Sequence, residues 1–128
     1  MLSQTVTRSI ESDADTMRIF SRLCDVALLP SWAPAFADRV EHVHGTTYRI
    51  TKGSSSFDVE LHTNEAARTV DYLRSMADGR RGGAYLRVLD KPLGGCVLVM
   101  TVPIAPNTTP EQVAVVVDQE LEALLRLS

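Results

Sequence analysis

The chain has 128 residues, of which 45% are hydrophobic, and a formal net charge of -3. These values are ordinary for a single soluble globular domain covering residues 1–128. A slightly acidic charge without a clustered basic face argues against a nucleic-acid-binding protein. The sequence opens without a signal-like segment and holds no apolar run long enough to cross a bilayer. We therefore expect a cytoplasmic protein that makes no stable membrane insertion.

The first third of the sequence predicts one strand followed by helices. Residues 4–11 alternate between polar and apolar side chains, as a half-buried strand does. Residues 14–24 show the helical spacing of apolar side chains, and Ser12 or Asp13 would cap this helix. Residues 25–38 are apolar but contain two prolines, so we expect one or two short helical turns packed over an opening.

The middle of the sequence predicts short strands separated by turn residues. These strands cover residues 39–44, 47–52, 56–63, 68–76, 84–90 and 95–104. The loop at residues 77–83 is glycine-rich and charged, which indicates the mobile tip of a hairpin. The last of the strands is apolar on both faces, so either both faces are covered or one is exposed for a partner.

Residues 110–127 predict a long amphipathic helix at the end of the sequence. Thr109 can cap it, and Pro110 suits its first position. Its apolar side chains repeat at helical spacing and need a broad apolar surface, which the preceding strands would supply as a sheet. The side chains of residues 113–117 are small, so a cavity would lie under the first half of this helix.

Three stretches of the sequence carry a resemblance to a known family. They are TRSIESDADTMRIFSRLCDVALLPSWAPAFADRVE at the front, RTVDYLR followed by LRVLD and a glycine pair in the middle, and EQVAVVVDQELEALLRL at the end. Together they resemble the START-like superfamily (SRPBCC) of polyketide cyclase/dehydrase, lipid-transfer and birch-pollen-allergen-like proteins. The resemblance implies a helix-grip α+β fold. In that fold a bent antiparallel sheet of seven strands wraps around the long C-terminal helix, and two short helices follow the first strand.

The resemblance also implies a function. Proteins of this family keep a cavity between the sheet and the terminal helix, which would open here near residues 28–36. We therefore expect the chain to bind or carry a hydrophobic or amphipathic small molecule, without a cofactor. One alternative is a cofactor-free cyclase/dehydratase that acts on a bound aromatic or polyketide-like substrate. A further alternative is a homodimer that associates through the sheet and has a collapsed cavity.

Large apolar side chains and tyrosines are the candidates for lining this cavity. Trp32 and Phe36 lie in a proline-broken segment and would form a lid, or alternatively plug the end of the sheet. Tyrosine hydroxyls can orient the polar end of a ligand, although tyrosines on half-buried strands are often plain core residues. The predicted ligand-binding residues are Trp32, Phe36, Tyr48, Phe57, Val59, Leu61, Tyr72, Met100, Val113 and Val117.

Arg8, Glu41 and Tyr72 are the candidates for a catalytic role. A two-residue turn at residues 45–46 would place Glu41 opposite Ile50 on an apolar face, and alternation puts Arg8 on an apolar face too. A charge in such a place needs a partner or a wet cavity. Arg8 could then bind a ligand carboxylate or enolate, and Glu41 could act as a general base. The alternative is a rim position or a register error of one residue.

We interpret the histidines as surface residues and not as metal ligands. His42 and His44 share one face of a predicted strand, as two metal ligands on a strand would. That face is the polar one, however, and His62 points outward from a different strand. We therefore predict no metal site.

Several arginines gather around the hairpin tip at residues 77–83. They are Arg74, Arg80, Arg81 and Arg87. An anion site is one interpretation of such a group. Because Asp78 and Asp90 lie among the arginines, the sequence favours a solvated tip of mixed charge.

Overall fold

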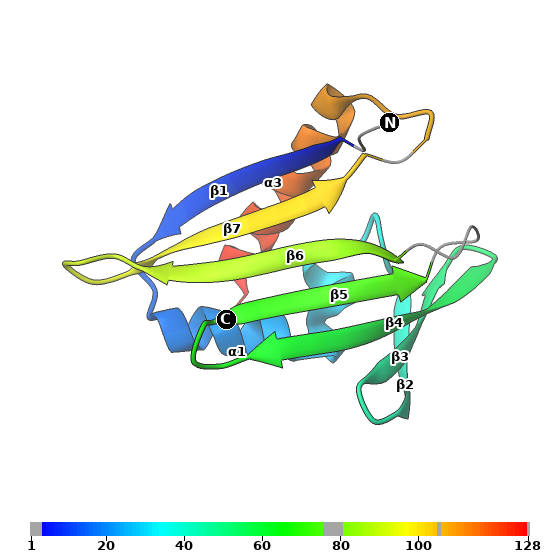
Figure 1. Ribbon diagram of the computed structural model, residues 1–128, viewed down its shortest axis with the longest axis horizontal. Helices are drawn as coiled ribbons and strands as arrows, with labels where there is room; N and C mark the ends of the chain where they lie inside the picture. Colours follow the sequence, from blue (N-terminus) through cyan, green and yellow to red (C-terminus); the bar gives the residue numbers. More distant parts are fainter. Residues whose placement is uncertain (1–3, 76–80, 105, 128) are drawn as a thin grey trace.

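One antiparallel sheet organises the chain, for which the computed structural model describes residues 4–75, 81–104 and 106–127. Its seven strands have the order β1-β7-β6-β5-β4-β3-β2 (Figure 1). The strands are β1 (Thr5–Ser12), β2 (Arg39–His44), β3 (Thr47–Lys52), β4 (Ser55–Asn64), β5 (Thr69–Ser75), β6 (Arg81–Asp90) and β7 (Cys96–Pro103). The helical elements are α1 (Thr16–Cys24), the short 3-10 helix η1 (Val26–Leu28), α2 (Leu29–Trp32) and α3 (Pro110–Arg126).

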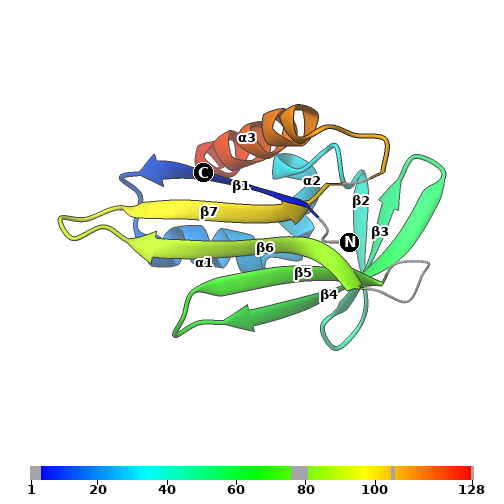
Figure 2. The same cartoon turned by 45° about the horizontal axis from the view of Figure 1, so that its top comes forward.

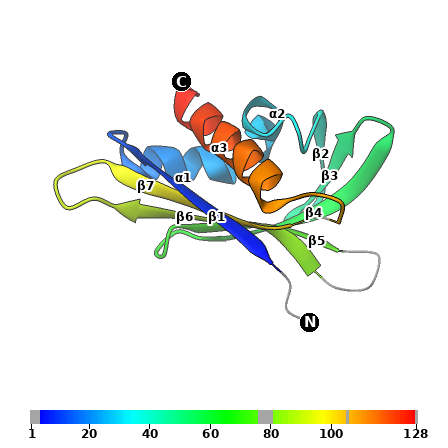
Figure 3. The same cartoon turned by 90° about the horizontal axis from the view of Figure 1, so that it is seen from above.

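The described helices all lie on one face of the sheet, which bends toward them (Figures 2 and 3). The helix α3 packs mainly along the edge strand β1, whereas α1 packs on β5 and β6. We call the face that carries the helices concave and the other face convex. The predicted sheet of seven antiparallel strands around a long terminal helix is therefore confirmed.

Local capping decides where the two longer helices begin. At the start of α3 the Thr109 side chain accepts from the Gln112 backbone N–H (3.2 Å), and the Gln112 side chain accepts from the Thr109 N–H (2.9 Å). This capping box confirms the predicted start. The helix α1 begins later than predicted, because its cap is Asp15, whose carboxylate accepts from the Met17 N–H (3.1 Å). Ser12 belongs to β1 instead.

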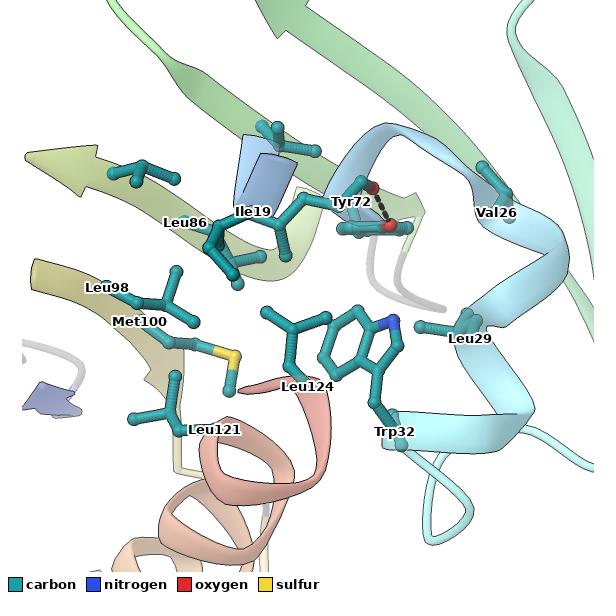
Figure 4. Close-up of a cluster of buried hydrophobic side chains, with 14 of the residues drawn as sticks. Ile19, Val26, Leu29, Trp32, Tyr72, Leu86, Leu98, Met100, Leu121 and Leu124 are labelled. Carbon is teal, nitrogen blue, oxygen red and sulfur yellow. Dashed lines mark hydrogen bonds between the residues drawn. The ribbon is translucent and has the colours of Figure 1, made fainter. Parts of the chain in front are cut away.

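Apolar side chains fill the space between α1, α3 and the middle strands (Figure 4). The fully buried ones include Ile19, Leu23, Val70, Leu86, Leu98, Met100, Leu121 and Leu124. Burying one such side chain stabilises the fold by roughly 1.5–3 kcal/mol. On the convex side of β7, where no described helix lies, Val97 and Val99 are half-buried. The strand that is apolar on both faces is thus covered by helices on one face.

The β2–β3 hairpin differs from the predicted register. A bulge between His42 and His44 places Val40, and not Glu41, opposite Ile50. The extra residue of a bulge reverses the alternation of side chains on its strand. Glu41 therefore points to the convex side and is exposed, and the prediction that placed it on the apolar face is wrong.

The predicted hairpin tip at residues 77–83 lies largely outside the described residues. The strand β6 already begins at Arg81, so the last part of the predicted tip belongs to a strand, and residues 76–80 are not described. Among the residues that are described, no helix is long and apolar enough to span a membrane.

Candidate functional site

A pocket of about 290 Å³ opens to solvent at the end of the concave face, beyond α2. It is formed by the segment that follows α2, the turn between β3 and β4, and the inner faces of β4 and β5. Its lining residues are Ala35, Phe36, Lys52, Ser55, Phe57 and Arg74. We call this the aromatic pocket.

Two phenylalanines give the aromatic pocket its apolar surface. Phe36 and Phe57 meet edge to face, with ring centres 5.2 Å apart and an interplanar angle of 66°. Phe57 points inward because it alternates with the buried Val59 and Leu61 on β4. Phe36 is held by a turn in which its N–H donates to the Ala33 carbonyl (3.0 Å). Both rings stay only half-buried, so each still offers apolar surface to a ligand.

Arg74 adds a cation to this aromatic surface. It lies on the inner face of β5 because it follows Val70 and Tyr72 at the strand period of two. Its guanidinium carbon is 3.9 Å from the centre of the Phe57 ring, a cation–π contact. No hydrogen bond or ion pair joins Arg74 to another residue within the described part of the chain.

The other cation of the pocket, Lys52, is already paired. Its Nζ donates to the Pro34 carbonyl (2.8 Å) and to Asp38 Oδ1 (3.1 Å). The Gly53 N–H donates to Asp38 Oδ2 (2.8 Å). This backbone hydrogen bond, together with Lys52, lowers the pKa of Asp38. Asp38 is therefore ionised at neutral pH and offsets the charge of Lys52, whereas the charge of Arg74 is not offset by any described residue.

The predicted ligand-binding residues fall into two groups in the structure. Phe36 and Phe57 line the aromatic pocket. The other eight all belong to the packed core or are partly buried against it: Trp32, Tyr48, Val59, Leu61, Tyr72, Met100, Val113 and Val117. Contact between these residues and a ligand stays a prediction, as does a cavity under the first half of α3.

Trp32 and Tyr72 form a buried aromatic pair beside the pocket segment (Figure 4). Their rings lie edge to face, with centres 6.1 Å apart. The Tyr72 hydroxyl donates to the Leu23 carbonyl, and burial raises the pKa of Tyr72 far above its usual range. The indole N–H of Trp32 has no hydrogen-bond partner within the described part of the chain. Because the Tyr72 hydroxyl already has a hydrogen-bond partner and is hard to ionise, it fits a structural role.

The three catalytic candidates do not come together. Arg8 does face the helices, but it donates to Asp118 of α3 through Nε (2.8 Å) and Nη2 (3.0 Å) at an exposed rim. Glu41 lies on β2, opposite Arg49 of β3. Because Arg8 faces the helices and Glu41 points to the convex side, the two side chains do not pair across a cavity.

The histidines lie on two different strands, His42 and His44 on β2 and His62 on β4. Because of the bulge, His42 lies on the same face of the sheet as Tyr48, and their ring centres are 5.1 Å apart. The prediction that placed His42 on the polar face of its strand is therefore wrong. His62 forms an ion pair with Glu60 (3.2 Å) on β4 when its ring is protonated. In the part of the chain that the structure describes, no three metal-ligating side chains are grouped to hold an ion.

Sequence reasoning overlooked two residues. Arg74 was assigned to a solvated tip, although its spacing from Val70 and Tyr72 already indicated the inner face. Glu120 of α3 is half-buried and makes no hydrogen bond or ion pair with any described residue. Burial raises its pKa to about 7. No local sequence signal distinguishes Glu120 from the other acidic residues of this helix.

Comparison with known proteins identifies the fold. No protein-family model matches the sequence, and no curated protein matches it. A START superfamily protein from Mycobacterium smegmatis has a similar solved structure, with a TM-score of 0.75 and 13% identity over 94% of each chain. The chain has the START-like helix-grip fold.

Two further solved structures show how widely this START-like fold is shared. The Zhui aromatase/cyclase from Streptomyces sp. R1128 matches with a TM-score of 0.68 and 16% identity, over 97% of this chain and 92% of that one. Ara h 8.0201 matches with a TM-score of 0.64 and 18% identity, over 97% and 96%. Likeness at these identities establishes the fold, while the function depends on the residues of the site.

Proposed function

We propose that this START-like protein binds a hydrophobic or amphipathic small molecule, with the aromatic pocket as the place where the ligand enters and is held. One observation carries the proposal. Phe36 and Phe57 pack against each other in a pocket open to solvent, and not inside the sealed core. Apolar rings that remain partly in water gain free energy when a ligand covers them, at about 25 cal/mol per Å² of apolar surface.

The size and place of the pocket support this proposal. Its volume of about 290 Å³ is near the lower end of small-molecule sites. The core beneath α3 is filled by side chains such as Met100 and Leu124, each at most 1% exposed. A ligand would therefore rest at the mouth of the concave face, with its ring system against the phenylalanines. The likeness to an aromatase/cyclase and to a START superfamily protein is consistent with this class of ligand.

A neutral dye tests the proposal directly. N-phenylnaphthylamine fluoresces strongly only in apolar surroundings, so titration of the protein with this dye measures filling of the pocket. We expect saturable binding that Phe57→Ala weakens about tenfold, because the dye loses one of two ring contacts. Val115→Ala is the matched control, since Val115 is an exposed apolar residue of α3 outside the pocket.

Two outcomes would contradict the proposal. One is the absence of saturable dye binding by the wild-type protein. The other is binding that Phe57→Ala and Phe36→Ala leave unchanged, because the dye would then sit elsewhere. Circular dichroism melts of each variant establish that loss of binding does not reflect loss of folding.

A further inference from the structure

Arg74 distinguishes the aromatic pocket from a plain hydrophobic patch. Its contact with Phe57 occupies the face of the guanidinium, and none of its five N–H donors has a partner among the described residues. A guanidinium commonly pairs with a carboxylate or phosphate through two parallel hydrogen bonds. The contact with Phe57 also orients the guanidinium before a ligand arrives, which lowers the entropy cost of binding.

The charge balance of the pocket points to an anion. Lys52 is neutralised by Asp38, which leaves Arg74 as a positive charge without a partner among the residues that the structure describes. The chain as a whole has a net charge of -3, so this local excess runs against the general charge of the molecule. An anionic group placed beside Arg74 would gain a charge-assisted hydrogen bond that a neutral ligand cannot make.

The distances define where that anionic group must sit. The guanidinium carbon is 3.9 Å from the centre of the Phe57 ring, and that ring is 5.2 Å from the ring of Phe36. A planar ring that packs against one of these two edge-to-face phenylalanines therefore has its own substituents within reach of Arg74. An anion attached directly to the ring reaches the guanidinium, whereas one at the end of a long flexible chain does so only at an entropic cost.

We propose that Arg74 makes the aromatic pocket selective for aromatic anions, meaning ligands with a carboxylate or sulfonate attached to a planar ring. This inference rests on the proposed function and specifies its ligand class. Arg74 is then the residue that determines specificity, while the phenylalanines supply affinity for the ring.

A pair of dyes that differ by one anionic group separates the two contributions. Anilinonaphthalene sulfonate has the ring system of N-phenylnaphthylamine plus a sulfonate. We expect the wild-type protein to bind the sulfonate about tenfold more tightly than the neutral dye. Arg74→Met keeps an apolar side chain over Phe57 but removes the charge, so this variant should bind the two dyes with equal affinity.

Two further variants complete the test. Arg87→Met makes the same change of charge at an exposed arginine of β6 and should keep the tenfold preference. Arg87 lies between the buried Leu86 and Val88, so it points to the opposite face of the sheet from them. Arg74→Lys keeps the charge but loses the planar fork, so an intermediate preference is expected. Raising the salt concentration should reduce the preference of the wild-type protein and have little effect on Arg74→Met.

The outcomes distinguish this inference from the proposed function. Equal affinities of the wild-type protein for the two dyes, or a preference that survives in Arg74→Met, would overturn the role of Arg74. Saturable binding of the neutral dye would still support the proposed function in that case. Absence of binding by both dyes would overturn both proposals.

Discussion

The concave face of the sheet has two parts that behave differently. Beneath α1 and α3 it is a packed part, in which side chains such as Leu98 and Leu124 are fully buried. Beyond α2 it is an open part, in which Phe36 and Phe57 remain half-exposed in a pocket that opens to solvent. The same sheet thus serves as a core at one end and as a surface for a ligand at the other.

The lengths of the covering helices explain the difference. The helix α3 has 17 residues and lies along β1, so its apolar stripe covers one side of the concave face. The helix α2 has only 4 residues and ends at Trp32. The proline-containing segment after it supplies Phe36 but no further helix, so the inner faces of β4 and β5 are left partly uncovered.

The largest predicted effect tests this division by truncating one residue in each part. Leu124→Ala should lower the free energy of unfolding by about 2–5 kcal/mol, because it leaves a cavity in a fully buried site. Phe57→Ala should cost only about 1 kcal/mol, because water can occupy the space in an open pocket. Urea unfolding of both variants measures the two values.

The exposed Val115 of α3 supplies the control for this pair. Val115→Ala removes an apolar side chain from the same helix as Leu124→Ala but from its exposed side, so stability should change little. A cost of Phe57→Ala equal to that of Leu124→Ala would show that the aromatic pocket belongs to the core.

Local patterns predicted most of the fold and part of the site. The inward alternation of Phe57 with Val59 could be predicted, because the strand period is a property of consecutive residues. The contact between Phe57 and Arg74 could not, because it needs the register in which Arg74 lies opposite Val59 on the neighbouring strand. Glu41 was misplaced for a related reason, since a bulge adds one residue without changing the composition of its strand.

The second predicted effect concerns an ionisable residue within the packed part. The pKa of Glu120 in the folded protein is about 7, against an ordinary value of 4.5. Between these two pH values the folded state binds more protons than the unfolded state, so stability falls as the pH rises through this window. Glu120→Gln should therefore be more stable than the wild-type protein at pH 8, by up to about 3 kcal/mol, and similar to it at pH 4.

The pH dependence of the difference between variant and wild type identifies the residue responsible. Glu122→Gln, at an exposed glutamate of the same helix, is the control for the loss of one negative charge. If the difference between Glu120→Gln and the wild-type protein were constant over this range, burial would not perturb Glu120. The packed part would then end before this flank of α3.

The smallest predicted effect asks what holds α3 on the edge of the sheet. Arg8 and Asp118 join β1 to α3 through two hydrogen bonds, but their side chains are 49% and 39% exposed. The hydrogen bond from Arg8 lowers the pKa of Asp118, so the contribution of the pair is present above the pKa of the unfolded state and disappears as the pH falls through the folded value. A double-mutant cycle with Arg8→Met and Asp118→Asn should give a coupling smaller than either effect above, and weaker still in concentrated salt. A coupling comparable to the loss in Leu124→Ala would mean that ions hold the helix in place. A small coupling would mean that α3 is held in place by the buried side chains of the packed part.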